Sequence, residues 1–460
     1  MNPFYNPAFL LRIARSYLSD IKRIWHIDIE ALQRYQDKAI RKMVRYAYTV
    51  PLYNRKYKEH GVHPSDIKGR KDIKKLPFIS KNDLKEHYPD DIIPKRFDKK
   101  HALLVSTSGS TGKPVFVYLD KFSSIRSLIG FARELKVYGG HWKKSRSALI
   151  IDMEPGSVEE AWFASSAVPL LKRFMSLQNI SYLHIGNKPE NIMKELDKFN
   201  PEFIGSDPNM LRQLAYLKNE GKGKDVNPIR LFSGGTILDS YTRKYIEKAF
   251  DAQVMDAYGT TEGGPLAFEC LKGNYHVHSD FVYLEFLDDE NEPVPYNTPG
   301  HIVITKLYGG GTPIIRYTGI DDVATPIEKQ CDCGITTEMI KQIEGRATDL
   351  IVLPSGKTLS PLTMTGIPAK TMEEFGSYKI KQFQIYQHSI DVVDIYIVIE
   401  EEQRNVGVPV KQLLDELQKR FSEKIGQGIK VTVKEVKTVK QVRPDSRIPA
   451  PVVISKVNKK

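Results

Sequence analysis

The residues best suited to chemistry form one loop rich in hydroxyls and glycines, Val105-Ser106-Thr107-Ser108-Gly109-Ser110-Thr111-Gly112-Lys113-Pro114-Val115. Apolar runs on either side of the loop predict short strands that enter and leave it. Glycines let backbone N–H groups converge on one point, and hydroxyls add further donors. A loop of this composition fits the phosphates of a nucleotide. It is not a Walker loop, because a proline and a strand follow Lys113 where that motif has Ser or Thr and a helix. A polar hairpin turn is the alternative interpretation.

Polar, glycine-bearing turns also follow three predicted strands downstream. They are 205–207, the turn with Ser233, Gly234 and Gly235, and the turn with Tyr258, Gly259, Thr260, Thr261 and Glu262. Strands and helices alternate between about 120 and 260, which predicts a largely parallel sheet with helices on both faces. Ligands of such sheets bind beyond the carboxyl ends of the strands. The turns therefore predict one shared binding site.

The cysteines and one histidine form a second group with metal-ligand chemistry. Cys270 is followed by His276 and His278, and Cys331 and Cys333 return later in a Cys-x-Cys-Gly turn. Three cysteines with His276 suit tetrahedral zinc, and four protein ligands leave no open position, so the site would be structural. His278, two residues further on, is the other histidine near Cys270. Buried or free thiols are the alternative.

The wider pattern predicts an α/β protein with two domains. A large N-terminal domain, 1–345, contains the mostly parallel sheet and a β-rich part after residue 280. A small, mobile α+β domain, 346–460, follows it. The chain of 460 residues is too long for a single core, which agrees with this division.

Composition limits the function further. A net charge of +12 favours anionic ligands, but the charge is spread along the chain and no nucleic-acid-binding module is recognised, so no nucleic-acid partner is expected. No run is apolar enough to span a membrane, and three cysteines form no disulfide framework, so a cytoplasmic location is the default. The N-terminal segment predicts a basic amphipathic helix, for which packing on its own domain and peripheral membrane contact both remain open. A homodimer also remains open.

Several of these motifs together resemble those of adenylate-forming enzymes. The motifs are 107–114, 258–262, Arg316-Tyr317 with Asp321, and Gly345-Arg346, in the family's order and rough spacing. The branch that looks most similar is the phenylacetate–CoA ligase branch, with its relatives in capsule-polysaccharide gene clusters. The resemblance implies activation of a small carboxylic acid by ATP and Mg²⁺ to acyl-AMP, with transfer to coenzyme A expected.

The resemblance also implies roles for individual residues. Residues 106–113, including Lys113, would hold the β- and γ-phosphates, and Gly234 and Gly235 would let adenine and the acid approach the backbone. The remaining implied roles are adenine stacking for Tyr258, an α-phosphate contact for Thr261, Mg²⁺ binding for Glu262, ribose binding for Asp321, and a ribose or phosphate contact for Arg346. Structural alternatives are a core aromatic for Tyr258, a helix cap for Glu262, a turn residue for Asp321 and a surface ion pair for Arg346.

Two positions depart from the family pattern. The family's C-terminal lysine would fall near Pro449, where Arg447-Ile448-Pro449-Ala450-Pro451 contains none, and the hinge position after Arg346 is Thr348. These departures keep two alternatives open. One is a polysaccharide-biosynthesis protein that transfers an activated acyl or amino acid to a sugar. The other is a catalytically weakened nucleotide-binding protein.

Overall fold

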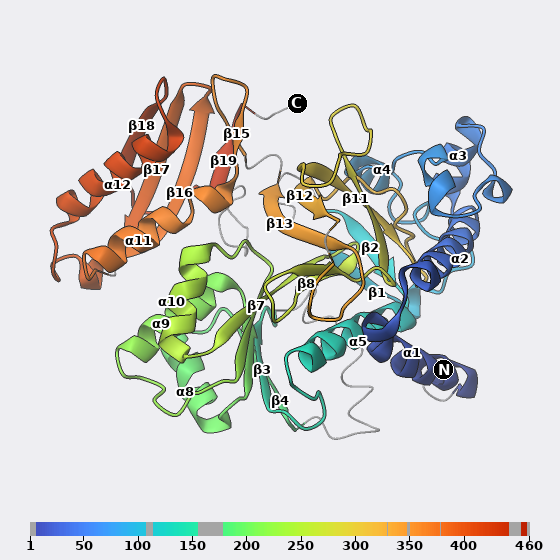
Figure 1. Cartoon of the computed structure of the whole chain (residues 1–460), viewed down its shortest axis with the longest axis horizontal. Helices are drawn as coiled ribbons and strands as arrows, with labels where there is room; N and C mark the ends of the chain where they lie inside the picture. Colours follow the sequence, from blue (N-terminus) through green and yellow to red (C-terminus); the bar gives the residue numbers. More distant parts are fainter. Residues whose placement is uncertain are drawn as a thin grey trace.

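Eleven strands form one continuous sheet in the computed structural model, which describes residues 6–106, 114–154, 178–328, 330–346, 350–377, 379–440 and 452–457. Their order is β10-β11-β12-β13-β9-β8-β7-β6-β5-β3-β4 (Figure 1). The strands are β3 (Ser147–Ile151), β4 (Ile180–His184), β5 (Phe203–Ser206), β6 (Arg230–Gly234), β7 (Gln253–Thr260), β8 (Gly264–Glu269), β9 (Tyr275–Val277), β10 (Val282–Leu287), β11 (Gly300–Lys306), β12 (Asp322–Ile327) and β13 (Met339–Arg346). The β-rich segment expected after residue 280 therefore extends the sheet that the parallel strands begin.

The parallel half consists of β4, β3, β5, β6 and β7. Helices α8 (Pro189–Phe199), α9 (Pro208–Asn219) and α10 (Ser240–Phe250) lie on one side of it, and α5 (Lys121–Val137) lies on the other (Figure 1). Asp120, Asp207 and Asp239 cap α5, α9 and α10, because each side chain accepts a hydrogen bond from a first-turn N–H. The alternation of strands and helices confirms the predicted α/β class.

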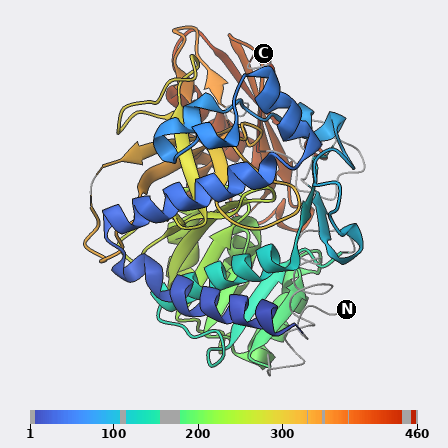
Figure 2. The same ribbon diagram turned by 90° about the vertical axis from the view of Figure 1, so that its right-hand side faces the viewer.

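The N-terminal segments cover the antiparallel half of the sheet. They comprise α1 (Pro7–His26), α2 (Ile29–Ala47), α3 (Pro51–Glu59), α4 (Lys81–Glu86) and the hairpin of β1 (Leu103–Ser106) and β2 (Phe116–Leu119). Figure 2 shows α1 and α2 running across this side of the molecule. Pro51 ends the periodic pattern of α2 and begins α3, where its missing N–H is not needed. Buried Ile40, Tyr53 and Ile304 belong to the core beneath these elements.

The C-terminal part has its own sheet and its own core. The sheet has the order β18-β17-β16-β19, and two helices pack on it. The elements are the hairpin β14 (Ile351–Val352) and β15 (Thr358–Leu359), α11 (Gly366–Glu374), β16 (Ile380–Ser389), β17 (Val392–Ile399), α12 (Val410–Ile425), β18 (Lys430–Glu435) and β19 (Val453–Ser455). Helix α11 lies against α10, and the Tyr241 hydroxyl donates a 2.7 Å hydrogen bond to Glu373. β13 ends at Arg346, which is the first residue of the predicted C-terminal domain.

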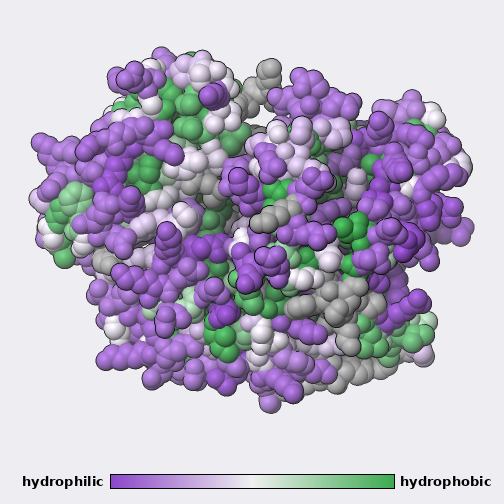
Figure 3. Space-filling view, viewed as in Figure 1, coloured by the Kyte–Doolittle hydropathy of each residue, from purple (hydrophilic) through white to green (hydrophobic). Residues whose placement is uncertain are grey.

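The surface seen in Figure 3 is predominantly hydrophilic, with apolar side chains in small separate patches. Among the described helices, none combines the length and the apolarity needed to cross a bilayer. Helix α1 packs through Phe9, Ile13 and Tyr17 on the face of α5 that contains Ile125 and Ile129. This packing agrees with the interpretation that the N-terminal helix packs on its own domain.

Candidate functional site

The hydroxyl-rich loop connects the two strands of the β1–β2 hairpin. Ser106 is the last residue of β1 and pairs with Phe116 of β2. Thr107, Ser108, Gly109, Ser110, Thr111, Gly112 and Lys113 lie outside the described residues. Two hydrogen bonds join the β2 strand of this hairpin to Thr312. The Tyr118 N–H donates to Thr312 Oγ1 at 3.1 Å, and the Thr312 N–H donates to the Tyr118 carbonyl at 2.9 Å.

The turns after β6 and β7 lie side by side at the carboxyl edge of the parallel strands. Ser233 is opposite Asp256 in the register, and Gly234 is opposite Ala257. A Cβ added to Gly234 would lie 3.3 Å from the Ala257 carbonyl oxygen, and Gly235 has a φ of +84°. Both positions therefore favour glycine, and the backbone here remains open to a flat ligand. This is the edge at which ligands of parallel sheets bind.

Tyr258 and Asp321 approach this edge from β7 and from the turn before β12. The Tyr258 hydroxyl donates a 2.6 Å hydrogen bond to Asp322 Oδ2. The neighbouring Asp321 accepts a 2.8 Å hydrogen bond from Lys81 Nζ on α4 and has a φ of +56°. The sequence predicted roles for Tyr258 and Asp321, and it predicted none for their partners Lys81 and Asp322. Arg346 ends β13 opposite Asp322 in the register, and its side chain lies outside the described part of the structure.

Glu262 lies in the turn between β7 and β8, and its side chain is buried. Gly259 and Thr260 end β7, and Thr260 Oγ1 accepts a hydrogen bond from the Gly263 N–H at 2.9 Å, which shapes this turn around Thr261. The Tyr317 hydroxyl donates a 2.8 Å hydrogen bond to Glu262 Oε1. Burial raises the pKa of Glu262, while the Tyr317 hydrogen bond and the charge of Lys81 oppose that shift. Glu262 lies in a turn between two strands, where there is no helix to cap, and a buried carboxylate in this position suits a cation.

Asp256 is a further buried carboxyl that sequence reasoning missed. Its Oδ2 accepts a 2.5 Å hydrogen bond from the Tyr275 hydroxyl. Its Oδ1 and the neighbouring Ser233 Oγ are buried, and the interaction with Ser233 lowers the pKa of Asp256 against the effect of burial. Burial raises the pKa of Asp256 to about 7.

We expect Asp256→Asn to stabilise the protein more at pH 8 than at pH 5. The carboxyl of Asp256 has an ordinary pKa of 3.8 in the unfolded chain, and burial raises this pKa to about 7 in the folded protein, so the wild-type protein loses stability as the pH rises between these values. Asparagine keeps an acceptor for Tyr275 and has no such loss. The difference between the two proteins should grow by up to about 3 kcal/mol between pH 5 and pH 8. Urea unfolding at both pH values measures it, and a difference that is constant with pH would contradict the prediction.

The structure brings the four predicted zinc ligands together. One ligand atom from each of Cys270, His276, Cys331 and Cys333 lies within 4.8 Å of all the others. Cys270 Sγ is 3.7 Å from Cys331 Sγ, and Cys333 Sγ is 3.3 Å from His276 Nε2. Burial lowers the pKa of His276 to about 4, so its imidazole is neutral at physiological pH, as a metal ligand requires.

His278 is excluded from this group by its own hydrogen bonds. Its Nε2 lies 2.8 Å from Glu134 Oε1, and its Nδ1 contacts Arg133 of α5. Arg133 in turn forms a fully buried ion pair with Asp280 at 2.9 Å. His278 therefore belongs to a network that holds α5 to the sheet.

Comparison with known proteins gives consistent results. A family model described as "AMP-binding enzyme" matches residues 55–308. A phenylacetate-coenzyme A ligase from Thermus thermophilus is 26% identical, over 88% of this chain and 92% of the relative. Protein CapK from Staphylococcus aureus is 24% identical, over 89% of this chain and 87% of the relative.

Solved structures share the fold over almost the whole chain. A 2-hydroxyisobutyryl-CoA ligase in the postadenylation state, in complex with R3-HIB-AMP, superimposes with a TM-score of 0.75 at 20% identity. The match covers 94% of this chain and 91% of that one. The predicted fold class, phenylacetate–CoA ligase-like resemblance and adenylate-forming ligase activity are confirmed. The chain therefore belongs to the AMP-binding enzyme family.

Proposed function

We propose that this protein uses ATP to convert a small hydrophobic or aryl carboxylic acid to acyl-AMP and then transfers the acyl group to coenzyme A. The proposal rests on three groups of residues that lie together at one edge of the sheet, in a chain of the AMP-binding enzyme family. These groups are Ser233–Gly235, Tyr258–Glu262 and the Lys81–Asp321 pair.

The two half-reactions place defined demands on these residues. A carboxylate oxygen attacks the α-phosphorus, and the bond to pyrophosphate breaks. A thiolate sulfur then attacks the acyl carbon, and AMP leaves. The ring of Tyr258, held by Asp322, would lie on adenine, and Asp321, held by Lys81, would accept from the ribose hydroxyls. Glu262 and the 106–113 loop would hold Mg²⁺ and the phosphates, where the ion neutralises phosphate charge.

A pyrophosphate-release screen over a panel of acids, with and without coenzyme A, tests the proposal. We expect release with at least one aryl or short branched acid, and formation of the thioester only when coenzyme A is added. A protein that binds AMP but releases pyrophosphate with no acid would contradict the activity.

A second candidate is transfer of the activated acyl group to a sugar. It is favoured by the 447–451 segment, which contains no lysine where the family's C-terminal lysine is expected and which lies outside the described residues. Thioester formation with coenzyme A at ordinary turnover would make this candidate unnecessary.

We also propose that Cys270, His276, Cys331 and Cys333 hold a structural zinc ion. Typical Zn–S and Zn–N bonds of about 2.3 and 2.0 Å in a tetrahedron imply S–S and S–N separations of about 3.8 and 3.5 Å. The observed separations of 3.7 and 3.3 Å are close to both values. Asn274 Nδ2 donates to Cys331 Sγ at 3.2 Å, the kind of outer hydrogen bond that supports a thiolate ligand.

A further inference from the structure

Helix α1 has an outer side that its packing on α5 leaves uncovered. Three leucines of this helix form what we call the leucine face: Leu10, Leu11 and Leu18, which are 41%, 71% and 68% exposed. Leu11 and Leu18 lie about two helical turns apart, so they share one stripe along the helix. Apolar side chains gather over α1 at the lower right of Figure 3. Single exposed leucines are common, but three on one helix form a face that suits an apolar partner.

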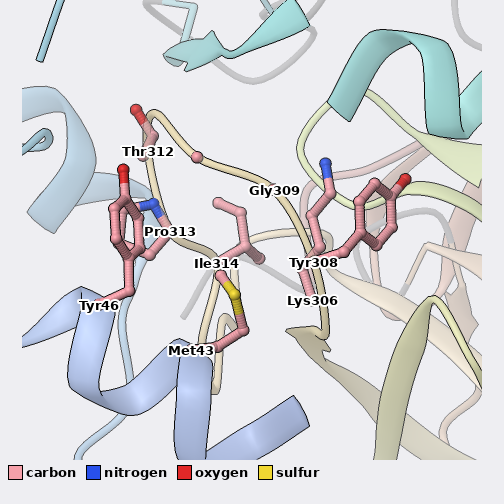
Figure 4. Close-up of a pocket in the computed structure, with 9 residues that line it drawn as sticks. Met43, Tyr46, Lys306, Tyr308, Gly309, Thr312, Pro313 and Ile314 are labelled. Atoms are coloured by element: carbon pink, nitrogen blue, oxygen red, sulfur yellow. The ribbon is translucent and has the colours of Figure 1, made fainter. Parts of the chain in front are cut away.

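Helix α2 runs across the same side of the molecule and presents cations to solvent (Figure 2). Its inner side is packed, because Figure 4 shows Met43 and Tyr46 pointing toward the loop after β11, and the Tyr46 hydroxyl donates to the Gly311 carbonyl at 2.7 Å. Spacings of four and three positions place its exposed cations along one stripe. The members of this cation stripe are Arg34, Lys38, Lys42 and Arg45.

The carboxylates of α2 leave most of the cation stripe uncompensated. Glu30 pairs with Arg34 at 3.4 Å, and Asp37 pairs with Arg70 at 3.0 Å. The other three cations of the stripe form no ion pair within the described part of the chain. The outer side of α2 therefore has a positive potential that attracts anions.

The two helices are joined by electrostatic interactions around Lys42. Burial lowers the pKa of Lys42, Arg12 of α1 and Arg126 of α5 lower it further, and Asp120 opposes them. Arg126 is partly compensated, because it also interacts with the buried carboxylate of Asp280. Arg12 and Lys42 are therefore close enough to act on each other, which places the cation stripe beside the helix that carries the leucine face.

We propose that the leucine face and the cation stripe together form a docking surface for a membrane of anionic lipids. A helix that lies in the membrane interface buries its apolar side at the headgroup boundary, and nearby cations contact the lipid phosphates. A second copy of the chain fits this surface less well, because a symmetric contact would bring two cation stripes together. Packing of α1 on α5 and docking of its outer side are compatible, since they use opposite sides of the helix.

Co-sedimentation of the full chain with vesicles tests the proposal. The vesicles contain phosphatidylcholine alone, or phosphatidylcholine with about one third phosphatidylglycerol. We expect binding to the anionic vesicles, and we expect it to weaken at least tenfold when the salt rises from about 0.1 M to about 0.5 M, because salt screens exposed charges. Vesicles of phosphatidylcholine alone should bind at least tenfold more weakly.

A leucine variant tests the apolar part of the surface. Leu11→Ser combined with Leu18→Ser should weaken binding to the anionic vesicles at least tenfold, because both side chains would enter the lipid interface. The matched control is Ile390→Ser, which alters a 43% exposed side chain between β16 and β17 and should leave binding unchanged. Circular dichroism checks that each variant is folded.

A charge variant tests the cation stripe. Lys38→Gln combined with Lys42→Gln should weaken binding about 30-fold, since each lysine near an anionic surface contributes about fivefold. Lys411→Gln combined with Lys419→Gln removes the same charge from exposed positions of α12 and should change binding less than about twofold. The leucine variant stands as the test if the Lys38, Lys42 variant does not fold.

Two results would overturn the proposal. One is equal binding to both kinds of vesicle, or anionic binding that neither the leucine nor the lysine variant weakens. The other is a wild-type dimer in sedimentation velocity that the leucine variant makes monomeric, with no vesicle binding by either protein, which would assign the leucine face to a second copy of the chain. The assay uses no acid, nucleotide or coenzyme A, so its outcome is independent of the proposed function.

Discussion

Replacing Glu262 by glutamine should lower the rate of acyl-adenylate formation by about 10²–10³-fold, the usual effect of removing one electrostatic contact to a phosphoryl or acyl transition state. Glutamine has nearly the same size and keeps an oxygen for the Tyr317 hydroxyl, which donates to Glu262 Oε1 at 2.8 Å. The substitution therefore removes the charge but keeps the packing of a side chain that is 4% exposed. The measurement is pyrophosphate release as a function of Mg²⁺ concentration, with the apparent Kd of Mg²⁺ expected to rise.

Tyr317→Phe is the matched control for this experiment. It removes the hydrogen bond to Glu262 and retains the carboxylate, so the rate should fall by no more than about tenfold, as expected for loss of one neutral hydrogen bond. AMP binding without Mg²⁺ should be nearly unchanged in both variants. If Glu262→Gln released pyrophosphate at the wild-type rate and with the same Mg²⁺ dependence, Glu262 would not be a metal ligand.

The parts of the fold that depend on local patterns were predictable. β3 and α8 belong to the predicted alternation of strands and helices, because a short apolar run and a proline at the first helical position are local signals. Short strands were missed where such signals are weak. β4, β8 and β9 were not predicted, and the last of these has only three residues.

The candidate site shows the same division. Glycines and hydroxyls after strands mark positions that a ligand can approach, so Gly234, Gly235 and Tyr258 could be found from the sequence. Lys81 and Asp256 could not. Lys81 is one of many lysines, and its partner Asp321 lies 240 positions away. Asp256 lies within a predicted strand, where nothing in the sequence distinguishes it as a site residue. Its position beside Ser233 and its hydrogen bond with Tyr275 are known only from the structure.

Removing the metal from the cysteine–histidine site should lower the melting temperature by about 5 °C. A ligand present at about 1,000 times its Kd stabilises the folded state by roughly 4 kcal/mol. With an unfolding entropy of about 2.1 cal/mol/K per residue, this corresponds to about 5–6 °C for the predicted N-terminal domain, 1–345. The four ligands come from the β8–β9 turn, β9 and the 331–334 turn before β13, so the ion would join three segments that are otherwise linked by short strand pairings. Elemental analysis should give one zinc ion per chain.

Two histidine variants separate loss of zinc from general destabilisation. His276→Ala removes a ligand and should abolish the zinc stoichiometry. His278→Gln, two residues along, disturbs the buried contacts with Glu134 and Arg133, and it should lower the stability while retaining the metal. This contrast follows from the geometry, because His276 Nε2 faces Cys333 Sγ while both ring nitrogens of His278 are engaged elsewhere. Zinc lost equally from both variants, or absent from the wild type, would mean that the three thiols only pack against the core.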